Sequence, residues 1–334
     1  MEIIPVVHCF DNNYVLPAAV AFYSLLENAN FDYFYKIYVL HNDITLENQE
    51  KLIKNIEKFK NSELIFIDMK NRFLDIWERL KAKEHYSKEM FYKLLTPSIF
   101  KEYEKIILSD VDVIYLDDIS KEFLNFDINE NFYFAGISGI GERNYYINLY
   151  KNYFSDEDVK KLKYGAGYLI MNLKKCREDS IEDKFFECIK NKIQGLKQPE
   201  QDVLNICCYP YIKSLPLKNM TCTYMYDEYG KEKEIYSKIR KSKEEIEEAL
   251  KNPVQLHYAT GTKPWKNLNC TKSKEWFNYL LKTSFAEEFL DNIQRKYIDN
   301  PNKLICKFNI PFSTKRKLIF TLEKSKKIKK WFKI

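Results

Sequence analysis

Two aspartates separated by one residue, Asp110 and Asp112, form the pattern in this chain that is best suited to chemistry. They follow an apolar run, residues 106–108, which predicts a buried strand. In extended backbone, residues i and i+2 project to the same side, so both carboxylates would meet at the end of that strand. Open α/β sheets bind ligands at such strand ends, and two close carboxylates repel unless a cation lies between them. The pattern therefore predicts a divalent-metal site for a phosphorylated substrate, with a solvated aspartate turn as the alternative.

A third candidate metal ligand, His257, ends an apolar segment and precedes a loop that suits a diphosphate. In that loop Gly261 permits close backbone approach, Lys263 supplies a point charge, and Trp265 would anchor the segment. A neutral imidazole binds Mn²⁺ alongside carboxylates. Together with the aspartate pair, His257 and Lys263 would neutralise a leaving diphosphate. The alternative is a purely structural histidine.

Two further groups of polar residues open loops or helices. Asp11, Asn13 and Tyr14 follow the first predicted strand, where they could contact a base and ribose or form an ordinary turn. Gln201 and Asp202 lie in the first turn of a predicted helix. The Gln201 carbonyl could stabilise positive charge at a sugar carbon, or the side chain could simply cap the helix. Asp202 and Glu200 could equally be partners of the helix dipole.

The elements that would position these residues alternate between strand and helix, which predicts a parallel or mostly parallel α/β sheet. Strands are predicted over residues 1–10, 36–41, 63–69, 106–108, 132–137, 168–171 and 254–258. Helices are predicted over residues 16–27, 45–59, 71–80, 87–100, 175–192 and 242–251, with a short one from residue 199. Residues 144–163 are polar and rich in tyrosine. Residues 273–297 are predicted to be helical and separate, so the domains expected are residues 1–270 and 271–334.

Length and composition indicate a folded protein with a substantial core. The chain has 334 residues, of which 45% are hydrophobic and 16% aromatic. No apolar run reaches the roughly 18 residues of a transmembrane helix, and no secretory signal is evident at the N-terminus. Eight scattered cysteines show no repeated metal-ligand spacing, which favours reduced thiols in a cytoplasmic compartment.

The positive charge of the chain is concentrated in a tail at residues 313–334. Nine basic residues stand there against Glu323, a net charge of +8, whereas the whole chain carries only +6. Apolar residues interleave with the lysines, as in a helix lying in a membrane interface. The sequence therefore predicts an anionic membrane surface as a partner and a peripheral location on its cytoplasmic face. A disordered basic tail and a nucleic-acid arm are the alternatives, and no nucleic acid is expected.

Taken together and in order, these stretches resemble glycosyltransferase family 8, over about residues 3–282. The matching motifs lie at residues 11–14, 110–112 (the DxD motif), 165–173, 200–205 and 263–265. The resemblance implies a Rossmann-like nucleotide-diphospho-sugar transferase fold of the GT-A type, α/β with a mostly parallel central sheet, plus a small helical C-terminal extension. Residues 312–317 resemble the membrane-associating region of the lipopolysaccharide enzymes in this family.

The resemblance also implies roles for individual residues. Asp11 and Asn13 would face uracil and ribose, Tyr14 would lie on uracil, and Lys93 falls where the family usually has an arginine that contacts the donor. Val111, Ala166 and Gly261 belong to motifs that touch the donor. The residues so assigned are Asp11, Asn13, Tyr14, Lys93, Val111, Ala166, Gly261 and Lys263 for the donor, Asp110, Asp112 and His257 for Mn²⁺ or Mg²⁺, and Gln201 and Asp202 for catalysis.

The chain departs from the family pattern at several positions. Gly165 replaces an asparagine that touches the donor sugar, Glu200 replaces an aspartate that faces it, and Lys93 cannot make the bidentate contact of an arginine. Residues 138–139 stand where relatives often have an acidic residue, and Gly261 comes one position late. All but the last lie near the sugar, so the identities of the hexose and the acceptor stay open.

The sequence thus predicts a retaining hexosyltransferase that moves galactose or glucose from a UDP-sugar to a saccharide acceptor, such as a lipopolysaccharide or lipooligosaccharide core. Metal and Lys263 would stabilise the UDP leaving group, and Gln201 would stabilise positive charge on the opposite face of the sugar. Covalent and same-face routes to retention both remain open. The alternative function is a catalytically silent subunit that binds a UDP-sugar or glycan at the membrane.

Overall fold

The computed structural model describes residues 1–70, 88–138, 148, 150–151, 153–161, 164–192, 196, 198–229 and 241–298. The helix predicted over residues 71–80 and the basic tail lie outside these residues. In the described part of the chain, no helix is both long enough and apolar enough to span a membrane.

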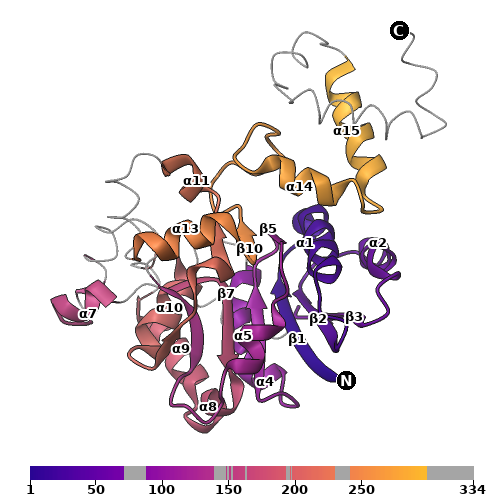
Figure 1. Ribbon diagram of the computed structural model, residues 1–334. Coiled ribbons are helices and arrows are strands. Elements are labelled where there is room, and N and C mark those ends of the chain that lie inside the picture. The colour runs from indigo at the N-terminus through magenta and orange to yellow at the C-terminus, as the bar shows by residue number, and fades with distance from the viewer. Residues whose placement is uncertain are drawn as a thin grey trace.

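A seven-stranded sheet forms the centre of the molecule (Figure 1), in the order β3-β2-β1-β4-β7-β6-β8. Neighbouring strands are parallel except where β7 pairs with β4 and with β6. The strands are β1 (Glu2–Cys9), β2 (Tyr33–His41), β3 (Ser62–Asp68), β4 (Lys105–Ser109), β6 (Phe134–Ser138), β7 (Tyr164–Asn172) and β8 (Ile212–Ser214). The predicted α/β fold with a mainly parallel central sheet is confirmed.

Both faces of the sheet are buried at its central strands, which explains why β4 and β7 are largely apolar runs without a polar face. Successive side chains of a strand point to opposite faces. On β1, Ile4 and Val6 belong to one hydrophobic core and Val7 to the other, and on β4 Ile107 and Leu108 divide in the same way. The result is a sheet between two layers, mostly of helices.

The layer on the first face contains α1 (Val15–Glu27), α2 (Leu46–Ile56), α5 (Ser120–Asn125), α11 (Tyr224–Glu228), α13 (Lys243–Lys251), α14 (Ser273–Leu280) and α15 (Ala286–Ile298). The layer on the second face contains η2 (Lys88–Leu95), α4 (Thr96–Ile99), α8 (Leu173–Glu178), α9 (Ile181–Lys192) and α10 (Pro199–Cys208). Three short helices complete the described elements: η1 (Asn12–Tyr14), η4 (Leu217–Met220) and α7 (Asp156–Lys161).

Local sequence explains where several helices begin. The Thr45 hydroxyl accepts the Asn48 N–H at the start of α2, and the Ser242 hydroxyl accepts the Glu245 N–H at the start of α13. Pro199 occupies the first position of α10, where its missing N–H costs nothing. These starts agree with the predictions made for residues 45, 242 and 199.

Four predictions of secondary structure need correction. The helix predicted over residues 175–192 is interrupted at Ser180, whose φ of 49° cannot continue a helix, so α8 and α9 are separate. Residues 88–95 form a 3₁₀ helix before the short α4. Strand β7 begins at Tyr164, so the glycines predicted to precede it lie within it. The helix predicted over residues 273–297 is two helices, α14 and α15.

The strand predicted over residues 254–258 lies in a second, three-stranded sheet. This small sheet has the order β5-β10-β9, formed by β5 (Val113–Tyr115), β10 (Gln255–His257) and β9 (Thr221–Cys222). Strand β5 follows β4 after only three residues, so the chain leaves the large sheet and enters the small one at the aspartate pair.

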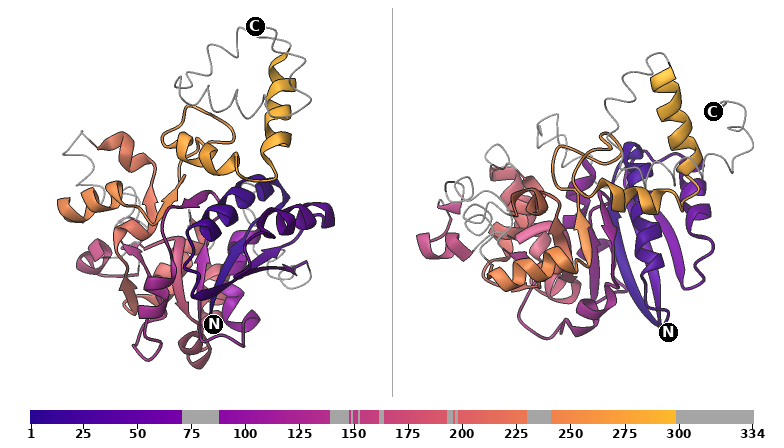
Figure 2. Two further views of the ribbon diagram at one scale, coloured as in Figure 1. Left: turned by 45° about the vertical axis from the view of Figure 1, so that its right-hand side comes forward. Right: turned by 45° about the horizontal axis from the view of Figure 1, so that its top comes forward.

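Helix α14 packs on α1 (Figure 2), and α15 follows it. Its Trp276 and Leu280 are fully buried in the same core as β1, and the Asn28 side chain at the end of α1 donates to the Tyr279 hydroxyl at 2.9 Å. The domain boundary near residue 270 remains a prediction. Helix α14, which follows that boundary, packs closely on α1 in the layer on the first face of the sheet.

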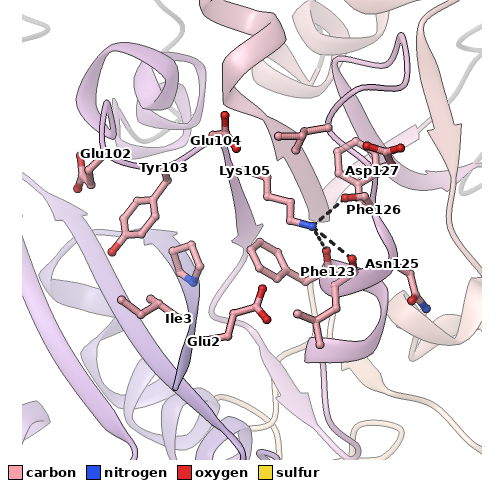
Figure 3. A pocket seen from close by; sticks show the side chains of 13 residues that line it. Glu2, Ile3, Glu102, Tyr103, Glu104, Lys105, Phe123, Asn125, Phe126 and Asp127 are labelled. Atoms are coloured by element: carbon pink, nitrogen blue, oxygen red, sulfur yellow. Dashed lines mark hydrogen bonds between the residues drawn. The ribbon is translucent and has the colours of Figure 1, made fainter.

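At the opposite end of β4 from the aspartates, Lys105 lines a cavity of about 530 Å³ (Figure 3). Its ammonium donates to the backbone carbonyls of Phe123, Leu124 and Phe126 at 2.6, 3.4 and 2.8 Å. The Phe123 carbonyl also accepts the Phe126 N–H at 3.3 Å, and the lysine adds a charged donor to the carbonyls at the C-terminus of α5, where it acts as a cap. Strand β4 is thereby attached to α5.

Candidate active site

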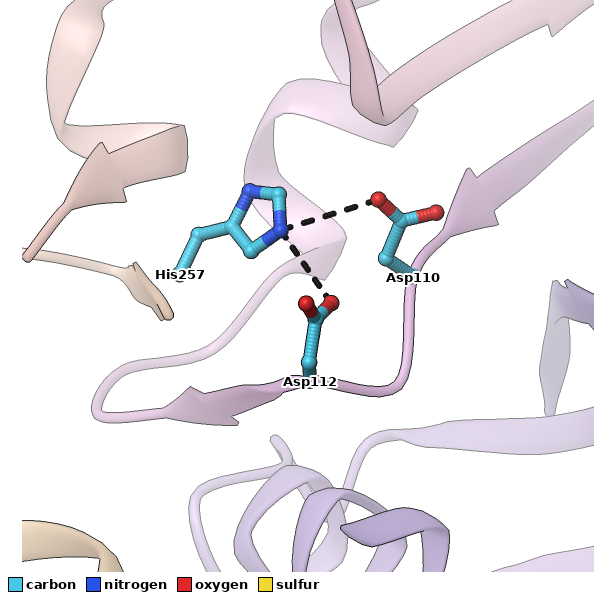
Figure 4. Close-up of side chains that lie close together, drawn as sticks. All are labelled: Asp110, Asp112 and His257. Carbon is cyan, nitrogen blue, oxygen red and sulfur yellow. Dashed lines mark hydrogen bonds and ion pairs between the residues drawn. The ribbon is translucent and has the colours of Figure 1, made fainter. Parts of the chain in front are cut away.

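Asp110, Asp112 and His257 come together at the junction of the two sheets (Figure 4). The His257 Nε2 lies 3.1 Å from Asp112 Oδ1 and 3.6 Å from Asp110 Oδ2. Their ligand atoms all lie within 4.8 Å of one another. The three side chains that the sequence assigns to the metal thus form one cluster.

Strand pairing explains how His257 reaches residues that precede it by almost 150 positions. In the antiparallel pair β5–β10, His257 is the partner of Val113, the residue after Asp112. The Tyr258 N–H donates to the Asp112 carbonyl at 2.9 Å and extends this register into the turn. Because Cys222 is the partner of His257 on the other side, the backbone of His257 is held between two strands.

A buried hydroxyl, Ser109, fixes the turn that carries the aspartates. It accepts hydrogen bonds from Tyr115 Oη at 2.7 Å and Gln255 Nε2 at 2.8 Å, and donates to the Asp110 carbonyl at 3.0 Å. The Asp110 N–H donates to the Gly167 carbonyl on β7 at 3.1 Å. Sequence reasoning missed Ser109, because a serine that ends a strand carries no signal of its distant partners.

Two lysines balance the two carboxylates. Lys93 Nζ lies 2.5 Å from Asp110 Oδ1 and also donates to the Ala166 carbonyl at 2.9 Å, with only 3% of its side chain exposed. Lys263 Nζ lies 2.5 Å from Asp112 Oδ2 and donates to the Tyr258 carbonyl. The like charges of the aspartate pair are thus compensated within the chain itself.

These contacts shift the acidities of the cluster. Burial alone would raise the pKa of Asp112, but His257 and Lys263 together lower it well below its usual range. Burial alone would lower the pKa of His257, and the charge and hydrogen bond of Asp112 outweigh it and raise that pKa to about 10. Burial likewise opposes a raised pKa of Lys93, which the nearby Asp110 and Glu200 carboxylates produce.

The donor set of the cluster fits a divalent cation of the Mn²⁺ or Mg²⁺ kind. Two carboxylates supply hard oxygen ligands, and one imidazole supplies a nitrogen that Mn²⁺ accepts. With its two lysines and two carboxylates already in balance, the site would become cationic on binding the metal. A site with that charge suits a diphosphate.

A cavity of about 410 Å³ opens beside the cluster. Its walls are Cys9, Phe10, Asp11, Tyr14, Met90, Lys93, Asp110, Val111, Asp112 and Glu200. Six of these are residues that the sequence assigns to donor or metal. The cavity therefore lies at the carboxyl ends of β1 and β4, where ligands of open α/β sheets bind.

Glu200 is the unexpected member of this wall, because the sequence marks it as a departure from the family pattern or as a partner of the helix dipole. Its side chain is buried, and Oε2 has no hydrogen-bond partner among the described residues. Burial raises the pKa of Glu200 to about 7, against the opposing effect of Lys93. A buried carboxyl group with an unused oxygen beside a cavity can accept a hydrogen bond from a ligand hydroxyl.

The loop after β1 is tightly organised. Asp11 Oδ1 accepts the Asn13 N–H at 2.9 Å, which starts η1, and the Asn13 side chain lies 3.4 Å from Asp11 Oδ2. Asn12 is structural, since its side-chain oxygen accepts from Thr45 and Asn48 at the start of α2. Asp11 and Tyr14 line the cavity, whereas Asn13 is exposed beside it.

Gln201 and Ala166 connect α10 to the metal cluster. The Ala166 N–H donates to Gln201 Oε1 at 3.2 Å, while its carbonyl accepts from Lys93, which holds Asp110. Asp202 lies apart, fully buried, accepting from Tyr150 Oη at 2.9 Å and from the Gln198 N–H at 3.1 Å. Those contacts give Asp202 a helix-capping and packing role within the described residues.

The two glycines near His257 differ in what they require. A Cβ on Gly167 would meet His257 Cε1 at 2.7 Å and Met220 Sδ at 2.8 Å, so only glycine leaves room for the imidazole. A Cβ on Gly261 would meet nothing within 4 Å. Sequence reasoning assigned Gly261 to the donor and missed the packing role of Gly167.

The fold is of the GT-A glycosyltransferase type, and comparison with known proteins gives the family. Residues 5–269 match Glycosyl transferase family 8. The chain belongs to this family, as its motifs predicted, and is therefore an enzyme, a glycosyltransferase. The prediction of a hexosyltransferase is confirmed at the level of the family.

Relatives of known name are similar over most of the chain. General stress protein A of Bacillus subtilis is 25% identical over 291 residues, which cover 85% of this chain and 95% of that protein. Lipopolysaccharide 1,2-glucosyltransferase of Escherichia coli is 23% identical over 283 residues, covering 82% of this chain and 76% of that protein.

Solved structures share the fold. Galactosyltransferase LgtC, in complex with donor and acceptor sugar analogues, superposes with a TM-score of 0.66 at 18% identity, covering 84% of this chain and 96% of LgtC. The bifunctional glycosyltransferase WbbM superposes with a TM-score of 0.69 at 20% identity. The match covers 87% of this chain but only about half, 51%, of WbbM.

Proposed function

We propose that this protein is a retaining hexosyltransferase that moves galactose or glucose from a UDP-sugar to a saccharide acceptor, with Mn²⁺ or Mg²⁺ at Asp110, Asp112 and His257. The observation that carries the proposal is the 410 Å³ cavity, whose walls include Asp11 and Tyr14 together with Asp110 and Asp112, the two carboxylates of the cluster that His257 completes. A nucleotide at one end and a metal-bound diphosphate at the other fit this arrangement.

The nucleotide would occupy the end of the cavity formed by the loop after β1. Asp11 offers a carboxylate and Asn13 an amide to the base and ribose, and the Tyr14 ring offers a face for the base. Val111 is buried and lines the cavity between the two aspartates, where it would make an apolar contact with the nucleotide. Asn13 is the most exposed of these groups.

Departure of UDP requires positive charge close to the diphosphate. When bound, a divalent cation would stabilise the developing negative charge of the leaving group as a Lewis acid. Lys263 and Lys93 hold fixed ammonium groups on either side of the aspartates, where they can serve the same diphosphate. Gly261 lies two residues before Lys263, in the loop that we expect to cover the phosphates.

The sugar would lie between the metal cluster and the N-terminus of α10. Glu200 can accept a hydrogen bond from a sugar hydroxyl through its unused Oε2. The Gln201 carbonyl is our candidate for stabilising positive charge at the anomeric carbon, and Ala166 positions it. Asp202 would act through the packing of α10, and covalent and same-face routes to retention are both compatible with this arrangement.

The acceptor that the family relatives suggest is the saccharide core of a lipopolysaccharide or a similar membrane-linked glycan. We propose that the tail of residues 313–334 brings the enzyme to such an acceptor by binding an anionic membrane surface on the cytoplasmic side. Nine basic residues against one acidic residue support this part of the proposal.

A donor panel tests the proposed function without knowledge of the acceptor. The full-length protein is incubated with Mn²⁺ and UDP-glucose, UDP-galactose, UDP-N-acetylglucosamine, ADP-glucose or GDP-mannose, and slow release of the nucleoside diphosphate is measured. We expect release from UDP-glucose or UDP-galactose, and NMR of the first sugar product formed should show the α-anomer. Release from the ADP- or GDP-sugars alone would overturn the assignment of the donor.

A further inference from the structure

We propose that Trp276 on α14 is a positioning residue for the loop that carries Lys263, acting through Trp265. Helix α14 is therefore a working part of the donor site and not a separable extension. The inference rests on the proposed function, because it concerns how the loop meets the donor diphosphate.

The loop leaves the small sheet at the metal ligand His257 and returns to the fold at the start of α14. Its two ends are tied together, since Tyr258 Oη donates to the Lys272 carbonyl at 2.8 Å and Ser273 Oγ donates to the Leu268 carbonyl at 2.6 Å. Within it, the Asn267 N–H donates to the Lys263 carbonyl at 2.8 Å. The base of the loop is therefore fixed, and its Lys263 end, which is bonded to Asp112 and the Tyr258 carbonyl, has further support from outside the loop.

That support is a chain of aromatic rings. The Trp265 ring lies 6.0 Å from that of Tyr14 in an edge-on arrangement and 5.7 Å from that of Trp276. Behind it, Trp276 contacts the rings of Phe277 and Phe289 at 5.2 and 6.0 Å. Trp265 therefore lies between Tyr14, in the loop after β1, and Trp276 on α14. It is only two residues from Lys263 in the sequence.

The type of residue at position 276 agrees with this role. Trp276 is fully buried, yet its indole Nε1–H has no acceptor among the described residues. A phenylalanine would remove the unpaired N–H but leave part of the core unfilled, so hydrogen bonding of the indole does not explain the tryptophan. The larger ring instead provides the surface on which Trp265 rests.

The test is the affinity for UDP of the full-length protein, measured by isothermal titration calorimetry in saturating Mn²⁺. The variants are Trp276→Phe, Lys263→Ala, the double variant that combines the two, and the matched core lesion Leu280→Ala on the same helix. Leu280 is also fully buried but has no ring to offer Trp265. Thermal unfolding of each variant separates loss of stability from loss of position.

We expect Trp276→Phe to weaken UDP binding about tenfold while lowering the melting temperature no more than Leu280→Ala does. Leu280→Ala should change affinity by less than about twofold. In the Lys263→Ala background, Trp276→Phe should change affinity by less than about twofold, since the lysine it positions is gone. Wild-type affinity in Trp276→Phe, or a tenfold loss that persists without Lys263, would overturn the inference. Failure of the wild type itself to bind UDP would overturn the proposed function and the inference with it.

Discussion

Substitution of Gly167 tests whether the position of His257 determines the affinity for the metal. A Cβ at this position would push on the His257 ring and on Met220, while the backbone bond to Asp110 would remain. We predict that Gly167→Ala weakens Mn²⁺ binding about 10- to 100-fold, as loss of support for a metal ligand typically does. Electron paramagnetic resonance of free Mn²⁺ during titration measures this.

Gly136→Ala is the matched control for that measurement. It adds the same methyl group to a strand of the same sheet, where the new carbon would meet only side-chain atoms of Phe134 and Tyr164, the nearest at 3.1 Å. Equal Mn²⁺ affinity of the two variants would show that Gly167 does not position His257.

Glu200 predicts a pH dependence of stability. Burial raises its pKa from an ordinary 4.5 to about 7, so the native state holds the proton more tightly than the unfolded chain does. Stability is therefore lost as the pH rises from about 4.5 to 7, by up to roughly 3 kcal/mol, and the loss is absent below that window. Glu200→Gln carries no titrating group at this position.

The stability of Glu200→Gln relative to the wild type should accordingly increase by up to roughly 3 kcal/mol between pH 4.5 and 7. Urea denaturation at both pH values measures the two free energies of unfolding. The same variant should turn over the donor more slowly, because the carboxylate that faces the cavity is gone. A stability difference that does not change with pH would contradict the burial of an ionisable Glu200.

At the scale of elements, substitution of Lys105, at the end of β4 remote from the site, should affect stability and not activity. Lys105→Met keeps the apolar stem but leaves three carbonyls at the end of α5 without their charged donor. We expect the free energy of unfolding to fall by about 1–3 kcal/mol, with donor turnover unchanged. Lys101→Met, at an exposed position, serves as the control and should change stability by less than about 0.5 kcal/mol.

The elements themselves were largely predictable from the sequence, because the strands of a sheet buried on both faces are plain apolar runs. Residues 2–9 and 105–109 show this clearly. The break at Ser180 was not predictable, since an apolar period continues through it and only its positive φ divides α8 from α9. Motifs at strand ends indicated which residues meet a ligand.

The contacts that assemble the site were less accessible to sequence reasoning. The loop after His257 and the family resemblance both made it a candidate metal ligand, but its place beside Asp112 depends on the register of β5 with β10, which local patterns do not encode. Lys93 and Lys263 both form ion pairs with the aspartates, which no spacing predicts. Glu200 shows the same limit, because only the fold reveals that it is buried in the cavity wall.

At the scale of the whole molecule, we expect the tail of residues 313–334 to be needed for membrane binding but not for catalysis. Removal of residues 313–334 takes away nine of the 54 basic side chains of the chain and leaves the described fold complete. We predict that the truncated protein keeps its donor hydrolysis but loses sedimentation with vesicles containing anionic phosphatidylglycerol. Each basic residue near such a surface contributes about 1 kcal/mol, so the loss should be large at low salt and small at high salt.

Vesicles of neutral phosphatidylcholine are the comparison for the full-length protein, which should leave them unbound. Equal sedimentation of the truncated and full-length proteins with anionic vesicles would show that the tail is not the membrane contact. Binding of duplex DNA in preference to the anionic vesicles would support the nucleic-acid alternative instead.

The measurement that tests the central claim most directly is Mn²⁺-dependent release of UDP from a UDP-hexose by wild type, Asp112→Asn and the distant control Asp127→Asn. Asp112 contacts both His257 and Lys263, whereas Asp127 is exposed at the far end of the molecule. We predict a loss of at least about 100-fold in Asp112→Asn and in chelator-treated wild type, with no loss in Asp127→Asn. Undiminished release by Asp112→Asn, or by the wild type in chelator, would contradict a metal–diphosphate site at this pair of aspartates.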